Sequence, residues 1–133
     1  FAARLPDGQA ARTDGHEAVE VSWAPAAAAL AWHARQAEIW LPPPTWHTAA
    51  RFAGLVGSAA IVLDTLAGSG VGPRYEPIRA PGDGTDVWIV LPGDPNHPDG
   101  EAWRRRIASE PARREPAVCR FVLCDGRLHP VEG

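Results

Sequence analysis

The chain has 133 residues, of which 45% are hydrophobic and 22% are charged, and its formal net charge at pH 7 is −3. This length predicts one domain with a core of its own, and the six tryptophans exclude a disordered chain. The slight excess of acidic residues disfavours a nucleic-acid partner. The sequence contains no methionine and opens at Phe1, so we expect a processed, truncated or excerpted chain.

Two strands are predicted near the N-terminus. Residues 1–5 have the character of a strand end, closed by the turn-forming sequence Pro6-Asp7-Gly8. In residues 17–23, apolar side chains at every second position alternate with polar ones. This alternation is typical of a half-buried strand.

Three helices are predicted next. Pro25 suits the first turn of a helix, and Thr45 and Ser58 are suitable N-caps for two more. The proline run at residues 41–44 is predicted to be extended and to end the first helix. A glycine-rich linker is predicted at residues 68–73. The predicted helices cover residues 25–37, 46–56 and 59–67.

The remaining residues are predicted to be rich in strands. Asp125-Gly126 is a strong signal for a tight hairpin turn. Residues 92–100 contain three prolines and predict a loop, whereas residues 103–108 fit either a short helix or an irregular arginine-rich segment. The predicted strands cover residues 75–79, 87–91, 118–124 and 127–131. The fold class is therefore predicted to be α+β, with an N-terminal part (1–67), a linker (68–73) and a β-rich C-terminal extension (74–133).

Two polar clusters could carry chemistry. Asp94, His97 and Asp99 share one loop and could form a metal or acid–base site, although such residues are also usual in tight turns, and we favour the turn. Arginines at 104–106 and 113–114 could receive a phosphate, but glutamates interleave with them, which favours a solvated face. The histidines and cysteines do not have the short spacings that are typical of transition-metal sites.

Four further residues are candidates for a site. Glu17 and Glu20 are the carboxylates nearest a predicted strand end, and at most one of them would face a given cleft, so solvation is the favoured interpretation. Trp40 and Trp46 flank the proline run, and their rings could form a wall for an aromatic ligand. Packing of the two helices explains the same tryptophans, and we favour it.

The two cysteines indicate the compartment. Cys119 and Cys124 would lie on opposite faces of one strand, about 17 Å apart, which is too far for a disulfide. We therefore expect reduced thiols and a cytoplasmic location. The first twenty residues do not have the pattern of a signal peptide, and the longest weakly polar run is too interrupted to span a membrane.

The order of several motifs resembles the C-terminal portion of the Nudix hydrolase family. Residues 1–9, FAARLPDGQ, resemble the strand that follows the catalytic helix of that family, and residues 20–25, EVSWAP, resemble its next strand-to-helix junction. Residues 38–46, EIWLPPPTW, resemble an element of bacterial relatives of the coenzyme A diphosphatases. Residues 89–95 and 120–127 resemble the tail of such bacterial proteins.

The resemblance implies a partial Nudix-like mixed sheet with helices, followed by a β-rich tail. It also implies cleavage of a diphosphate linkage in nucleoside-diphosphate or coenzyme A type substrates, with Mg²⁺ or Mn²⁺ as cofactor of the complete protein. In some members of the family, an acidic residue in the loop before the tryptophan-bearing strand assists metal binding, and Glu17 and Glu20 lie near that position. The resemblance also places Trp40 and Trp46 near the bound substrate.

The glutamate-rich box that defines the family is absent from this sequence. Arg114-Glu115 is the only Arg-Glu pair, and Pro116 follows it, which is incompatible with the helix that the box requires. We therefore expect the chain alone to be inactive and to bind no metal or other cofactor. In the intact protein the expected partner is a small-molecule diphosphate, with no nucleic acid or membrane, and exposed strand edges would favour self-association.

A second hypothesis belongs to another class. In it the chain is a non-catalytic binding or regulatory module on a Nudix-like scaffold. The tryptophan–proline corner or the arginine cluster would then bind a partner. A start codon directly before Phe1 would favour this module, whereas an upstream glutamate box would favour the hydrolase.

Overall fold

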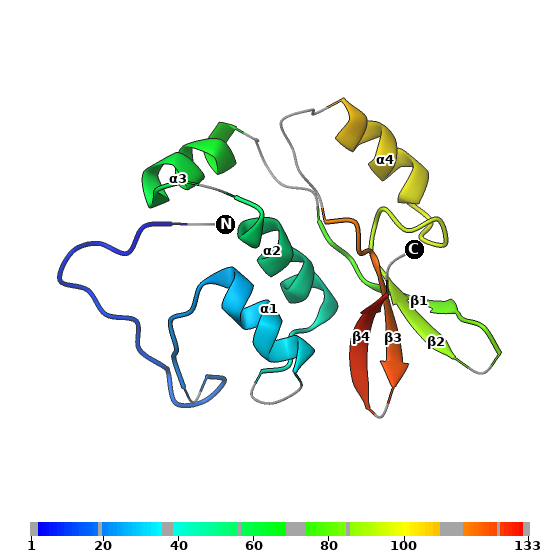
Figure 1. Cartoon of the computed structure of the whole chain (residues 1–133), viewed down its shortest axis with the longest axis horizontal. Helices are drawn as coiled ribbons and strands as arrows, with labels where there is room; N and C mark the ends of the chain where they lie inside the picture. The colour runs from blue at the N-terminus through cyan, green and yellow to red at the C-terminus, as the bar shows by residue number, and fades with distance from the viewer. Residues whose placement is uncertain are drawn as a thin grey trace.

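A computed structural model gives the structure of the chain, and it describes residues 3–18, 20–35, 39–55, 57–68, 74–84, 86–109, 116–124 and 126–131. Within these ranges the chain forms four helices and four strands (Figure 1). The helices are α1 (Ala26–Ala34), α2 (Pro43–Ala53), α3 (Ala59–Gly68) and α4 (Gly100–Ala108). The strands are β1 (Ile78–Pro81), β2 (Val87–Val90), β3 (Arg120–Cys124) and β4 (Arg127–Val131).

The strands form one sheet in the order β1-β2-β3-β4, and each strand is antiparallel to its neighbour. All four lie within the predicted β-rich extension, and β3 and β4 form the predicted hairpin. Gly126 in the turn of this hairpin has a φ of 74°, a conformation that glycine adopts without steric cost. The α+β class is thus confirmed. The described strands pair only as antiparallel neighbours and all lie in the β-rich tail, so the Nudix-like mixed sheet of the N-terminal part remains a prediction.

The helices follow the predicted positions except for α2, which begins three residues before the predicted helix and ends at Ala53 instead of residue 56. Ser58 precedes α3, and its hydroxyl accepts the N–H of Ile61 at 3.5 Å, as expected of an N-cap. The prediction that the whole proline run is extended is wrong, because α2 begins at Pro43 instead of Trp46. The first helical positions need no N–H donor, so prolines fit there as well as in an extended chain. Of the two alternatives for residues 103–108, the helix is confirmed as part of α4.

The two predicted N-terminal strands are wrong for the residues that the structure describes. Residues 3–5 and 20–23 lie outside any strand and are exposed. The side chain of Trp23, predicted to be half-buried, is 74% exposed. An alternating pattern gives a strand a potential buried face, but a strand forms only when a neighbouring edge accepts its backbone hydrogen bonds. Residues 1, 2 and 19 lie outside the described ranges.

The core lies where α2 and α4 meet the sheet. Its apolar side chains are Ala80, Val90, Leu91, Trp103 and Phe121. Trp46 of α2 packs edge-on against Phe121 of β3, with ring centroids 5.6 Å apart. His47 of α2 contacts Tyr75, which in turn contacts Trp103 of α4. These aromatic contacts join the helical part to the sheet.

Part of the predicted linker and part of the arginine-rich region cannot be compared with the structure. Residues 69–73 of the predicted linker are outside the described ranges, as are residues 110–115. None of the helices that the structure describes combines the length and the apolar character that a membrane crossing requires. The boundary between an N-terminal part and a C-terminal extension remains a prediction.

Candidate functional site

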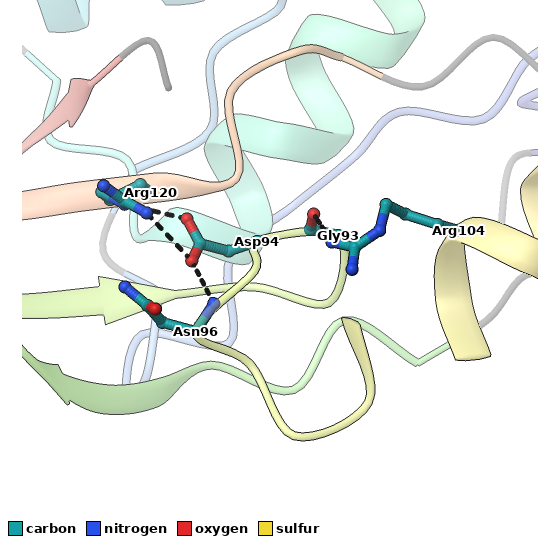
Figure 2. Close-up of polar contacts among 5 residues, drawn as sticks. All are labelled: Gly93, Asp94, Asn96, Arg104 and Arg120. Atoms are coloured by element: carbon teal, nitrogen blue, oxygen red, sulfur yellow. Dashed lines mark hydrogen bonds and ion pairs between the residues drawn. The ribbon is translucent and has the colours of Figure 1, made fainter. Parts of the chain in front are cut away.

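The polar loop after β2 is organised around Asp94, whose side chain is buried. Its carboxylate accepts hydrogen bonds from Nε and Nη2 of Arg120, at 2.8 and 3.2 Å, and from the backbone N–H of Asn96 at 2.8 Å (Figure 2). The Arg120 guanidinium also lies 4.1 Å from the centre of the Trp88 ring. Hydrogen bonding to Asp94 raises the pKa of Arg120 above its ordinary value. This group, Asp94 with Arg120 and Trp88, therefore anchors the loop to β3 and β2.

Glycine is required next to Asp94. Gly93 has a φ of 113°, and a Cβ atom there would lie 2.9 Å from Sγ of Cys119. The carbonyl of Gly93 accepts a hydrogen bond from Nη1 of Arg104 at 3.2 Å (Figure 2). Because Gly93 has no side chain, the loop can lie close to Cys119 while Arg104 of α4 binds its carbonyl oxygen.

His97 completes the loop, and its ring is also buried. Nδ1 accepts the N–H of Asp99 at 3.1 Å, so the other ring nitrogen carries the proton and donates to the carbonyl of Glu76 at 3.1 Å. The carboxylate and the imidazole thus have structural partners, which favours the tight-turn interpretation of Asp94, His97 and Asp99. Among the residues that the structure describes, no group of three or more histidine, cysteine or acidic side chains could hold a metal ion.

The arginine cluster is divided among several local contacts. Arg104 binds Gly93, and Arg105 forms an exposed ion pair with Glu101 one helical turn away, at 2.7 Å. Exposed pairs of this kind contribute about 0.5 kcal/mol or less to stability. Residues 113 and 114 are outside the described ranges, so the structure brings together only part of the predicted basic group.

Glu17 and Glu20 lie in the N-terminal segment, of which residues 3–18 and 20–24 are described and all except Thr13 are exposed. The backbone N–H of Glu17 donates to Oδ1 of Asp14 at 3.1 Å, and the carboxylate of Glu20 accepts the hydroxyl of Ser22 at 3.4 Å. Asp14 also accepts the N–H groups of His16 and Ala18, and these backbone donors, His16 foremost, lower the pKa of Asp14. The turn at residues 14–18 is thus built by Asp14, while the side chains of Glu17 and Glu20 are solvated.

The two candidate tryptophans have different environments. Trp46 is half-buried against Phe121, which favours the core-packing interpretation for this residue. Trp40 is 50% exposed and precedes Leu41, whose backbone N–H is bound by His33. Trp40 is therefore the member of the pair that a ligand could reach.

Sequence reasoning missed two of the buried polar residues, His33 and His47, and the partner of a third. His33, His47, Asp94 and His97 are buried, and only Asp94 and His97 were considered as candidates. The partner of Asp94, Arg120, is 26 positions away and meets it only because β3 pairs with β2. His33 lies among alanines on α1, and the only feature of the sequence that indicated its burial was its helical spacing from Leu30.

Comparison with known proteins adds no relative. No protein-family model matches the chain, and neither the curated proteins nor the solved structures give a significant match.

Proposed function

We propose that the chain is the C-terminal part of a Nudix-type hydrolase that cleaves a diphosphate linkage in nucleoside-diphosphate or coenzyme A type substrates. The order of the motifs at residues 1–9, 20–25 and 38–46 supports this family. The observation that carries the proposal is the exposure of residues 3–5 and 20–23, which were predicted to be strands but pair with no strand that the structure describes. A sheet contributed by another part of a larger domain would give Val21 and Trp23 a surface to pack against.

The residues of this chain do not by themselves fit the Mg²⁺ or Mn²⁺ that such an enzyme uses. The glutamate box is absent from the sequence, and the described residues contain no group that could hold a metal ion. The metal site would therefore belong to the other part of the domain. In this chain Glu17 and Glu20 would lie near the diphosphate, and Trp40 would contact the remainder of the substrate, with Trp46 holding the corner against Phe121.

An activity assay tests this proposal directly. The chain alone, incubated with Mg²⁺ and a panel of diphosphate substrates, should release no phosphate product above background. The translation product that includes the codons upstream of Phe1 should turn over at least one of them. In that longer product, Trp40→Ala should raise KM with a smaller effect on kcat, because the ring would contribute binding and not chemistry. Leu123→Ala, which removes an exposed apolar side chain of β3 away from the proline corner, is the control.

The outcomes separate the two classes of function. Robust turnover by the chain alone would show that its own residues suffice for hydrolysis, which would contradict the proposal that the metal site belongs to another part of the domain. A longer product without hydrolysis, or a start codon directly before Phe1, would instead favour the non-catalytic binding module, for which the exposed rings of Trp23 and Trp40 are available.

We further propose that the N-terminal segment promotes self-association of the isolated chain. Leu5, Val21 and Trp23 are all exposed, and extended apolar segments pair readily with open sheet edges. Size-exclusion chromatography should give an apparent mass that rises with concentration. A monomer at all concentrations would contradict both the self-association and the idea that this segment normally has a sheet neighbour.

A further inference from the structure

A histidine side chain of α1 forms a hydrogen bond with the backbone just before α2. His33 lies in the last turn of α1 and is 7% exposed, and its Nδ1 accepts the backbone N–H of Leu41 at 3.1 Å. Leu41 lies two residues before the start of α2 at Pro43. The hydrogen bond therefore ties the end of one helix to the approach of the next, across eight residues of sequence.

This hydrogen bond requires an unprotonated nitrogen. An imidazole nitrogen accepts a hydrogen bond only when it carries no proton, so the geometry places the ring proton of neutral His33 on Nε2. Protonation of the ring would make both nitrogens donors. The N–H of Leu41 would then face another N–H, and a charge would be buried at the same position. The bond and the protonated ring are therefore mutually exclusive.

The neighbouring elements contribute few ionisable groups. On α2, which packs against α1, they are His47 and Arg51. On β4 they are Arg127 and His129, of which His129 acts electrostatically on His33. The ring of His47 lies against Tyr75. Burial lowers the pKa of His33, and the positive charge that His129 can carry lowers it further.

We propose that His33 is a pH-sensitive latch, which holds the corner at Trp40 and Leu41 in place while its ring is neutral and releases it when the ring is protonated. The inference is independent of the proposed hydrolase function, because it concerns only contacts within this chain. The released state would expose the backbone of Leu41 and give Trp40 more freedom. Any ligand bound at that corner would then be held more weakly at acid pH than at neutral pH.

Hydrogen exchange of the wild-type chain tests the latch. The protection of the Leu41 amide, normalised to its intrinsic exchange rate, should fall severalfold between pH 7.5 and pH 5, while amides in the centre of α2 change less. ¹⁵N spectra of the histidine rings at pH 7.5 should show Nδ1 of His33 without a proton. A protonated Nδ1 at pH 7.5, or equal Leu41 protection at both pH values, would overturn the proposal without any variant.

Substitutions then assign the effect to His33. In His33→Asn the side-chain oxygen takes the place of Nδ1 as an acceptor that cannot titrate, so Leu41 protection should be nearly independent of pH. His16→Asn removes an exposed histidine and should behave like the wild type. If His33→Asn loses protection in acid as the wild type does, the latch is assigned to the wrong group.

Discussion

The sheet and the N-terminal segment are similarly rich in residues that favour strands, but their environments are opposite. In β2 the side chain of Val90 is fully buried between β1 and β3, whereas in the N-terminal segment the side chain of Trp23 is 74% exposed. Both stretches are rich in residues that favour strands. The difference is that β2 is paired on both edges, while residues 20–23 lie outside the sheet. Residues that favour strands therefore mark a segment that can be buried, and the presence of a neighbouring strand edge decides whether it is.

The largest effect is expected at the centre of the sheet. Phe121 of β3 is fully buried and contacts Trp46, so Phe121→Ala should destabilise the protein by about 3–5 kcal/mol through lost burial and a cavity. Urea unfolding followed by circular dichroism measures this change. Leu123→Ala on the same strand is the control, because Leu123 is exposed and should cost about 1 kcal/mol or less. Equal losses for the two variants would contradict the core as described.

A smaller effect is expected at the buried ion pair. Asp94→Asn keeps the shape of the side chain but removes the charge that faces Arg120, and the loss should be about 2–3 kcal/mol because Asp94 is buried. The comparable change in an exposed pair, Glu101→Gln opposite Arg105, should cost about 0.5 kcal/mol or less. Urea unfolding at constant ionic strength measures both. A loss at Glu101 as large as that at Asp94 would show that burial does not distinguish these pairs.

Acid should destabilise the helical hairpin through His33. Burial, assisted by His129, lowers the pKa of His33 in the folded protein below its ordinary value near 6.5. As the pH falls, His33 therefore becomes protonated in the unfolded chain before it does so in the folded protein. The contribution of neutral His33 to the free energy of unfolding is complete above pH 6.5, and it is lost as the pH drops through the folded pKa. The urea midpoint should decrease more between pH 7.5 and pH 5 for the wild type than for His33→Asn. An identical decrease would assign the acid sensitivity to other groups.

The smallest effect is expected in the N-terminal segment. Trp23→Ala should change the free energy of unfolding of the monomeric chain by about 0.5 kcal/mol or less, because the ring buries little surface. Trp46→Ala, which removes the ring packed on Phe121, should cost about 2 kcal/mol or more. Thermal or urea unfolding at low protein concentration measures both. A large loss for Trp23→Ala would mean that the segment is buried after all.

Local signals in the sequence were sufficient for most helices and for the hairpin. Ser58 and Gly126 act through their immediate neighbours, so their positions could be predicted. The start of α2 was missed because Pro43 and Pro44 are compatible with both an extended chain and a first helical turn. The pair of Asp94 with Arg120 depends on strand pairing, and the burial of His33 on the packing of α1 and α2, so neither is visible in a local pattern.

The turn at residues 14–18 has one more consequence. Asp14 accepts three backbone N–H groups within this short stretch, and the N–H of Gly15 donates to the carbonyl of Ala18, so the turn needs no contact with the rest of the fold. A molecule that binds the N-terminal segment would meet these residues in an ordered shape. The conformational entropy of fixing them would already have been lost before binding, which favours tighter association than an equally long featureless segment would allow.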